Sequence, residues 1–235
     1  MDLDGCTHMR VLAIIPAFNE EESLERTVSE LQCIAPWVDF VVINDGSTDG
    51  TETICRDNAY PVITMPINCG LTVGFQTGMR YAQRKGYDVV VQFDADGQHR
   101  PEYLESMLQE MMKGNRDIVI GSRFIEAKKD YSPRMIGSRL ISSIIRLTTG
   151  KKLSDPTSGL RMFNRKMIEV FTLDASLNPE PESIAYMIRK GADVSEVSVQ
   201  MREREAGESY LSFSKSVSYM LRACTSILFV QWFRG

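Results

Sequence analysis

The chain has 235 residues, of which 43% are hydrophobic and 25% are charged. This balance is typical of a globular protein and excludes a disordered or collagen-like chain, and the length fits one α/β domain with an appendage. Lys and Arg number 27 against 31 Asp and Glu, and the resulting net charge of −4 argues against a dedicated nucleic-acid-binding protein.

Short apolar runs alternate with helical patterns through the first half of the chain. The sequence predicts strands over residues 11–15, 40–43, 62–65, 89–93 and 118–120, and helices over residues 20–34, 49–58, 71–85 and 101–113. We expect Ser47 or Thr48 to cap the second of these helices. Strands and helices that alternate at this spacing form βαβ units with a parallel sheet, and continuous apolar runs are typical of strands buried on both faces.

The second half of the chain breaks this alternation. Residues 126–132 are polar and are predicted to form a loop. The pattern predicts helices over residues 135–147, 165–171, 184–190 and 211–233, and strands over residues 160–163 and 194–201. In the first of these helices one face is formed by Ile136, Leu140, Ile144 and Leu147. The pattern as a whole predicts one compact α/β domain that ends in a helix.

The cysteines and the two ends of the chain bear on its compartment. Five cysteines without C-x-x-C spacing argue against disulfides and a structural zinc site, and indicate a reducing compartment. The first residues include Asp2 and Asp4 and no apolar stretch, so we do not expect a signal peptide. Near the C-terminus the 11 residues 223–233 are uncharged, fewer than the roughly 20 that a membrane-spanning helix needs. We therefore expect a cytoplasmic protein.

Acidic side chains follow two of the predicted strands. Asp45 follows the second strand, and Asp94 and Asp96 follow the fourth. Ligands of an open parallel sheet bind beyond the carboxyl ends of its strands. Two carboxylates past a buried strand are costly unless a cation neutralises them, and Mg²⁺ or Mn²⁺ favours such carboxylates together with phosphate oxygens. The alternative for these residues is a turn rich in Asp and Gly.

Six motifs in order carry a resemblance to a known family. They are P-A-F-N-E (residues 16–20), N-D-G-S-T-D-G-T (44–51), D-A-D-G-Q-H (94–99), G-S-R (121–123), D-P-T-S-G-L-R (155–161) and R-E-A-G-E-S (204–209). Together they resemble the family 2 glycosyltransferases of the GT-A fold, in the branch of polyprenyl-phosphate sugar synthases such as dolichol-phosphate mannose synthase. The resemblance implies a Rossmann-like, mostly parallel central sheet flanked by helices.

The resemblance also implies roles for individual residues. Asp45 would bind the base or ribose of a sugar nucleotide, and Asp94 and Asp96 would hold the metal and the diphosphate, assisted by Gln98. The other residues assigned to substrate binding are Pro16, Ala17, Asn19, Glu20, Asp155 and Ser158, of which the last two would line the acceptor side. Besides Asp96, the residues assigned to catalysis are Arg123 and Arg204, which would neutralise phosphates, and Glu182.

Two of the implied roles have open questions. Glu182 stands where the family has a carboxylate at the start of a helix, and it is either a general base or a first-turn acid favoured by the helix dipole. Relatives often have G-x-S-K where this chain has G-E-S-Y at residues 207–210, so the lysine expected to touch a phosphate is missing there. Whether Lys215, six residues after Ser209, takes the place of this lysine is left open by the sequence. His99 is interpreted as a loop residue near the donor.

The implied reaction is displacement with inversion at the anomeric carbon of a nucleoside-diphosphate sugar, with Mg²⁺ or Mn²⁺ as the metal. UDP-sugar is favoured over GDP-sugar, and the acceptor is a polyprenyl phosphate used in cell-envelope glycan synthesis. Such an acceptor is anionic near pH 7 and needs little help from a base, so Glu182 would be required only for a sugar hydroxyl. The alternatives are a transferase acting on a saccharide hydroxyl and a GT-A-fold binding or scaffold protein with weak turnover.

Two segments favour contact with a membrane. Residues 128–166 contain ten Lys and Arg and two Asp, a balance of +8. The last helix is predicted to be amphipathic, with an apolar face formed by Val217, Met220, Leu221, Cys224, Ile227 and Leu228, and no acid follows residue 208. Such a helix is typical of a membrane interface, which would place the protein on the inner face of the cell membrane. The alternatives are packing on the domain's own core, a homodimer interface and a membrane-protein partner.

The predicted organisation follows from these patterns. We expect an N-terminal tail (residues 1–9), a GT-A domain (10–208) and a C-terminal amphipathic helix (209–235). Within the domain, residues 10–123 would form the nucleotide-sugar half and residues 124–208 the acceptor half.

Overall fold

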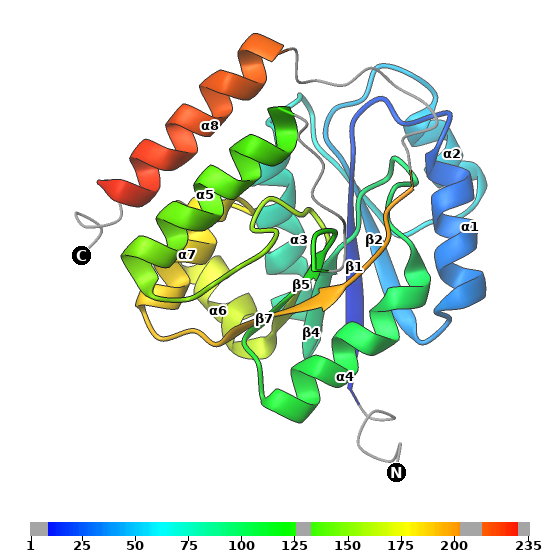
Figure 1. Cartoon of the computed structure of the whole chain (residues 1–235). Helices are drawn as coiled ribbons and strands as arrows, with labels where there is room; N and C mark the ends of the chain where they lie inside the picture. The colour runs from blue at the N-terminus through cyan, green and yellow to red at the C-terminus, as the bar shows by residue number, and fades with distance from the viewer. Residues whose placement is uncertain (1–8, 126–132, 203–212, 230–235) are drawn as a thin grey trace.

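The computed structural model describes residues 9–125, 133–202 and 213–229, and for residues 133–136 and 213–219 it describes the backbone alone. A seven-stranded sheet lies at the centre, with helices on both of its faces (Figure 1). The strands are β1 (Val11–Ala17), β2 (Val38–Asn44), β3 (Val62–Thr64), β4 (Val89–Gln92), β5 (Ile118–Ser122), β6 (Arg161–Asn164) and β7 (Val194–Ser198).

The strands lie in the order β3-β2-β1-β4-β6-β5-β7. β6 runs antiparallel to its neighbours β4 and β5, and the other paired strands are parallel. The prediction of a mostly parallel sheet is therefore confirmed. Arg161, the first residue of β6, is in register with Gln92 of β4 and Ile120 of β5. The chain thus enters β6 from the edge at which the parallel strands end.

The helices are α1 (Leu24–Ile34), α2 (Thr51–Asp57), α3 (Leu71–Lys85), α4 (Leu104–Gly114), α5 (Pro133–Thr149), α6 (Arg165–Leu173), α7 (Pro181–Arg189) and α8 (Phe213–Leu228), with a 3-10 turn η2 (Pro101–Tyr103) before α4. The predicted cap of α2 is wrong, because Gly50 occupies the cap position. Ser47 and Thr48 instead bond to Asn19, since the Asn19 N–H donates to Ser47 Oγ and Asn19 Oδ1 accepts from the Thr48 N–H.

The sheet separates two apolar cores. Successive side chains of β1 point to opposite faces, so that Leu12 and Ile14 join one core while Ala13 and Ile15 join the other. Helices α3, α5, α6, α7 and α8 cover the first core, and α1, α2 and α4 cover the second. Burial on both faces explains why the strands are continuous apolar runs in the sequence.

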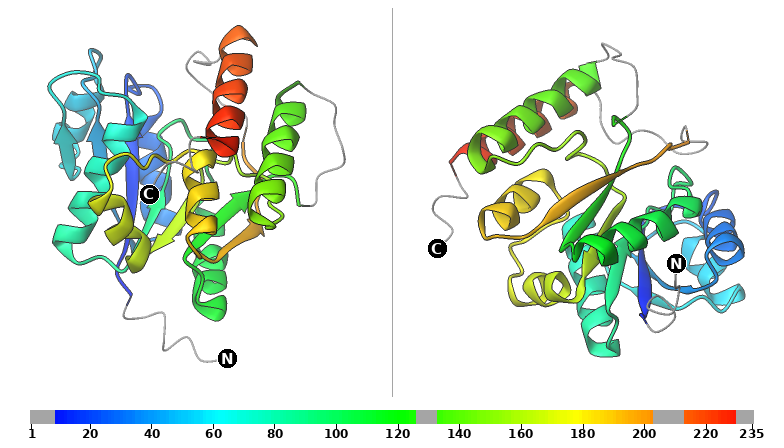
Figure 2. Two further views of the ribbon diagram at one scale, coloured as in Figure 1. Left: turned by 90° about the vertical axis from the view of Figure 1, so that its left-hand side faces the viewer. Right: turned by 60° about the horizontal axis from the view of Figure 1, so that its bottom comes forward.

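Helices α5 and α8 lie side by side, next to α7 (Figures 1 and 2). In α5 the buried residues are Ile141 and Ile145, whereas Leu140 is 48% and Leu147 is 80% exposed. The apolar face predicted for this helix is therefore wrong at Leu140 and Leu147, whereas the predicted Ile144 is partly buried and packs against the core. Ile136 of the predicted face lies outside the described side chains.

The C-terminal helix α8 also packs on the domain. Of the predicted apolar face, Cys224 and Ile227 are buried, whereas Leu221 is 61% exposed. Ala223, which was not part of the predicted face, is also buried. The described part of α8 thus meets the core of its own domain, which was one of the alternatives. The side chains of Val217 and Lys215 and the whole of residues 230–235 lie outside the description.

Candidate active site

The loops that follow β1 and β2 are joined to each other at one edge of the sheet. The Asp45 N–H donates to Ala17 O (2.8 Å), and the Glu20 N–H donates to Thr51 Oγ1 (2.9 Å). Asn19 has a positive φ of 56°, a conformation that Asn tolerates well, and its side chain accepts from the Thr48 N–H (2.9 Å). The structure thus brings together the predicted residues Ala17, Asn19, Glu20 and Asp45, with Pro16 at the end of β1.

Asp45 is almost fully buried, and its carboxylate binds backbone. One oxygen accepts from the Cys69 N–H and the other from the Gly70 N–H, both at 2.8 Å. These two residues immediately precede α3, and Gly70 has a φ of +85° that favours glycine. The carboxylate therefore holds the start of α3 against the end of β2. A carboxylate can accept about four hydrogen bonds, so these two leave acceptor positions for a ligand. The predicted contact of Asp45 with a base or ribose stays a prediction.

Asp94 and His99 form a closed turn after β4. The Asp94 N–H donates to His99 Nδ1 (2.9 Å), and His99 Nε2 lies 3.6 Å from Asp94 Oδ2. The His99 side chain is 3% exposed and packs edge-on to Phe93, while the Asp94 side chain is 36% exposed. The Asp94 carboxylate itself accepts from Gln92 Nε2 of β4, at 3.2 Å from Oδ1. His99 therefore holds the backbone of the turn and Gln92 bonds to the carboxylate, and the sequence interpretation named neither contact.

The same turn carries Asp96 and Gln98. The Gln98 N–H donates to Asp96 Oδ1 (3.0 Å), and Asp96 is 5% exposed. Gly159 packs tightly against the turn, because a Cβ on this glycine would lie 2.8 Å from Asp94 Oδ2. The motif that contains Gly159 therefore lies against Asp94 and His99.

The residues present fit a divalent cation that binds partly through substrate. Among the described residues, no group of three or more His, Cys, Asp and Glu side chains forms a complete metal cage. Asp94 and Asp96 supply two carboxylates on one turn, and Gln98 supplies an amide beside them. Mg²⁺ and Mn²⁺ are commonly held by one or two carboxylates together with phosphate oxygens of the substrate.

Arg123 follows β5 and pairs with Asp155. Asp155 is fully buried, and its carboxylate accepts from Arg123 Nε (2.6 Å) and Nη2 (2.8 Å) and from the Arg123 N–H (3.1 Å). Thr157 Oγ1 contacts both side chains, at 3.0 Å from Asp155 and 3.2 Å from Arg123. This fork uses the Nε and Nη2 side of the guanidinium. The Arg123 side chain is 25% exposed, and among the described residues no hydrogen bond is formed by Nη1.

The loop that carries Asp155 is held by Glu196 of β7. The two carboxylate oxygens of Glu196 accept from the Ser154 N–H (2.6 Å) and the Asp155 N–H (2.8 Å). Ser158 is also fully buried, and its hydroxyl accepts from the Leu160 N–H (3.3 Å). Asp155 and Ser158 thus act within the loop, and their predicted contact with an acceptor stays a prediction. No spacing in the sequence indicates Glu196.

The start of α7 is tied to the same edge by a buried arginine. Arg161 is 1% exposed, and its guanidinium donates to the carbonyls of Pro156 (2.8 Å) and Pro179. Glu182 lies in the first turn of α7, where it accepts from Asn178 Nδ2 (3.1 Å). This contact fits the interpretation of Glu182 as a first-turn acid, and a role as a base stays a prediction. Arg204 and residues 207–210 lie outside the description.

Comparison with known proteins finds related sequences over most of the chain. A model of the family described as glycosyl transferase family 2 matches residues 12–172. Undecaprenyl-phosphate mannosyltransferase of Micrococcus luteus is 34% identical over 220 residues, which cover 87% of this chain and 88% of that protein. Polyprenol monophosphomannose synthase of Mycolicibacterium smegmatis is 31% identical over 223 residues, which cover 87% and 82%.

Solved structures of low sequence identity share the fold. Glucosyl-3-phosphoglycerate synthase from Mycobacterium tuberculosis, in complex with Mn²⁺, uridine diphosphate and phosphoglyceric acid, gives a TM-score of 0.68 at 15% identity and covers 97% of this chain and 80% of that one. A mannosyltransferase from Pyrobaculum calidifontis, in complex with GDP-Man and Mn²⁺, gives 0.67 at 18% identity and covers 97% and 66%. Since the family model spans more than half of the chain and both sequence relatives exceed 30% identity, the chain belongs to glycosyl transferase family 2 and is a glycosyltransferase of the GT-A fold.

Proposed function

We propose that this glycosyltransferase moves a sugar, with inversion, from a nucleoside-diphosphate sugar to a polyprenyl phosphate, as one step of cell-envelope glycan synthesis. The observation that carries the proposal is the turn with Asp94 and Asp96, at the same sheet edge as Arg123, in a chain whose relatives over 87% of its length are named as polyprenyl-phosphate mannosyltransferases. The Mn²⁺ in structures of the same fold supports a divalent metal.

The residues of the site have distinct tasks in this proposal. Asp94, Asp96 and Gln98 would hold the metal, which neutralises the charge that develops on the departing diphosphate. Arg123, oriented by Asp155, would offer its Nη1 edge to a phosphate oxygen. Asp45 and the loop after β1 would hold the nucleoside. Arg204 completes the proposed set of phosphate-binding residues.

A phosphate acceptor suits this site better than a sugar hydroxyl. A phosphate oxygen is anionic near pH 7 and attacks without prior deprotonation, whereas a hydroxyl needs a general base. The one carboxylate proposed as a base, Glu182, hydrogen-bonds to Asn178 within its own helix start. A hydroxyl acceptor would require that bond to be exchanged for one to the substrate.

A thermal-shift panel tests the donor class. We expect UDP with Mn²⁺ to raise the melting temperature, and we expect UDP-sugars to do so more than GDP-sugars. At a hundredfold excess over the dissociation constant, binding adds about 2.7 kcal/mol to the free energy of unfolding. Stabilisation by GDP instead of UDP would correct the base, and no shift with any nucleotide and metal would favour the scaffold alternative.

We further propose that the outer surface of α5 and α8 contacts an anionic membrane. Leu140 and Leu147 of α5 and Leu221 and Phe229 at α8 are exposed, beside the exposed Arg139, Arg146 and Arg222. Neither helix contains an acid. None of the described helices is long and apolar enough to cross a bilayer.

Vesicle sedimentation measures this contact. The double variant with Leu140→Ser and Leu147→Ser is expected to reduce binding to phosphatidylglycerol vesicles at least about fivefold, because it removes two exposed apolar side chains worth about 1 kcal/mol or more in transfer. Leu173→Ser, at another exposed leucine (86% exposed), is the matched control. Equal binding by the wild type and the double variant would remove α5 from the proposed surface.

A further inference from the structure

We propose that Glu30 of α1 and Arg202 form a positioning pair for the metal-binding turn of residues 94–99. The inference rests on the proposed function, because it takes Asp94, Asp96 and Gln98 as the metal-binding residues. Neither Glu30 nor Arg202 belongs to a motif, and 172 positions separate them in the sequence.

One face of α1 packs against the turn of residues 94–99. Thr27 Oγ1 donates to Ala95 O (3.0 Å), in a buried contact. Arg26, the preceding residue, lies against Gly97, because a Cβ on this glycine would be 2.6 Å from Arg26 Nη2. Gly97 also has a φ of +74°, so both its conformation and its surroundings favour glycine. Helix α1 therefore contacts the turn at two successive residues.

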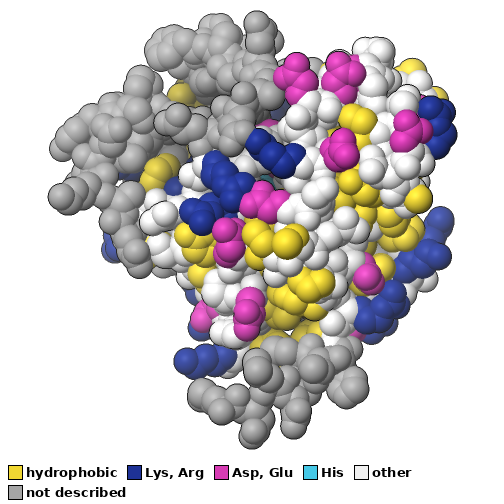
Figure 3. Space-filling model, turned by 90° about the vertical axis from the view of Figure 1, so that its right-hand side faces the viewer, with side chains coloured by type: hydrophobic (Ala, Val, Ile, Leu, Met, Phe, Trp, Pro, Cys, Tyr) yellow, Lys and Arg dark blue, Asp and Glu magenta, His cyan; other side chains and the backbone are white. Residues whose placement is uncertain are grey.

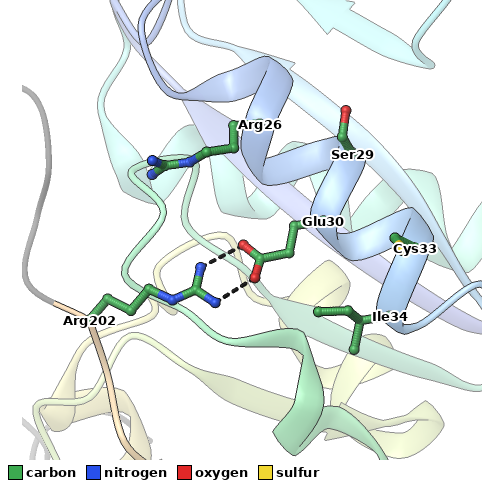
Figure 4. Close-up of a pocket in the computed structure, with 6 residues that line it drawn as sticks. All are labelled: Arg26, Ser29, Glu30, Cys33, Ile34 and Arg202. Carbon is green, nitrogen blue, oxygen red and sulfur yellow. Dashed lines mark hydrogen bonds and ion pairs between the residues drawn. The ribbon is translucent and has the colours of Figure 1, made fainter.

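Arg202 links the same helix to Gln98. Its guanidinium forms a fork with the Glu30 carboxylate, with Nη1–Oε2 and Nη2–Oε1 distances of 2.6 and 2.5 Å (Figure 4). Its backbone pairs with Gln98, since the Arg202 N–H donates to Gln98 O (3.0 Å) and Arg202 O accepts from Gln98 Nε2 (3.4 Å). The bond from Gln98 Nε2 uses the amide nitrogen of Gln98. The amide oxygen, which is the atom that can bind a metal, lies on the other side of the amide group.

The geometry of the pair favours positioning over stability. The side chains of Glu30 and Arg202 are 21% and 32% exposed, and pairs in contact with water add little to the free energy of unfolding. A two-bond fork, however, fixes the direction of the arginine as well as its distance. The pair borders a pocket of about 470 Å³, on a face where Lys and Arg side chains lie directly beside Asp and Glu side chains (Figure 3).

The chain of contacts runs from Glu30 through Arg202 to Gln98 and from there to Asp96, whose Oδ1 accepts from the Gln98 N–H. Loss of the fork removes one contact that fixes Arg202, whose backbone forms the two bonds to Gln98. The expected consequence is a metal-binding turn that is formed but no longer held in one position. Such a change weakens metal binding more than it weakens the fold.

Mn²⁺ binding to the full chain tests this inference. Glu30→Gln and Arg202→Gln are each expected to weaken Mn²⁺ binding by about 5- to 30-fold, measured by electron paramagnetic resonance with UDP or GDP present. Loss of a direct partner of a metal ligand costs roughly 10- to 100-fold, and the fork acts one contact further out, through the backbone of Arg202. The melting temperature should fall by less than about 4 °C, as expected for the loss of one partly exposed pair. The double variant with Glu30→Gln and Arg202→Gln should bind Mn²⁺ about as tightly as whichever single variant binds it less tightly, because both changes break the same contact.

The matched control is Arg165→Gln. It removes the exposed pair of Arg165 with Asp88, whose nitrogen and oxygen lie 3.1 Å apart, and it should leave Mn²⁺ binding unchanged. Mn²⁺ binding by both Glu30→Gln and Arg202→Gln within twofold of the wild type would overturn the inference, as would additive losses in the double variant. Asp96→Ala, measured in parallel, separates the two proposals: if it also binds Mn²⁺ and nucleotide like the wild type, the proposed metal site itself is wrong.

Discussion

Asp96→Ala is expected to abolish sugar transfer while the protein stays folded. Asp96 follows a buried strand and is 5% exposed, and in the proposed function its carboxylate is one of the two that bind the metal at the diphosphate. Loss of a metal-binding carboxylate removes several kcal/mol of transition-state stabilisation, and about 3 kcal/mol already corresponds to a rate at least 100-fold lower. Asp96→Asn keeps an oxygen that can accept from the Gln98 N–H and loses only the charge, so it should lose transfer to a similar extent.

Transfer of a labelled sugar from UDP- and GDP-sugars to a polyprenyl phosphate in detergent gives the measurement, and circular dichroism reports the fold. The matched control is Asp57→Ala, because Asp57 ends α2 with a side chain that is 65% exposed and paired with the exposed Arg56. The control is expected to keep wild-type turnover. If Asp96→Ala retains more than a tenth of that turnover, the metal-dependent scheme is wrong.

Asp155→Ala is expected to lower the free energy of unfolding by about 3 kcal/mol or more. The change removes a fully buried carboxylate and leaves Arg123, three-quarters buried, without its charged partner. Breaking one side of a buried ion pair costs about 3–5 kcal/mol, because the remaining charge is uncompensated. Turnover should fall as well, since Arg123 loses the fork that orients it.

Urea unfolding of the wild type and the variant measures this effect. In the double variant with Arg123→Met part of the lost stability should return, because no buried charge is then left unpaired. Arg165→Ala, which breaks an exposed pair, is the control and should cost less than about 1 kcal/mol. A loss below about 1 kcal/mol for Asp155→Ala would show that the Arg123–Asp155 pair does not hold this edge of the sheet.

Local patterns predict most of the elements and the acidic turn. The strand predicted over residues 11–15 is observed as β1, and the helix predicted over residues 71–85 is observed as α3 with the same bounds. These predictions succeed because periodicity and turn residues act over a few neighbouring positions. The pair Asp94 and Asp96 was found for the same reason, since two acids after an apolar run are a local signal.

Contacts between distant residues lie beyond such patterns. Strand β6 consists of two apolar residues between Arg161 and Asn164, and nothing in this sequence shows that the strand runs antiparallel between β4 and β5. In α5 apolar residues form two adjoining stripes. The periodicity predicted the stripe with the exposed Leu147 and the partly buried Ile144, in place of the one with the buried Ile145. The choice between such stripes depends on the area that α7 and α8 cover, which only packing determines.

The sequence by itself therefore determined the family, the mostly parallel sheet and the acidic turn at its edge. The tertiary structure decided which partners each charged residue has. It pairs Arg123 with Asp155, holds Asp155 by Glu196 and ties Glu30 to Arg202, across separations of 32, 41 and 172 positions. Charged side chains meet where strand order and helix packing bring them, and that order follows from burial of apolar surface throughout the chain.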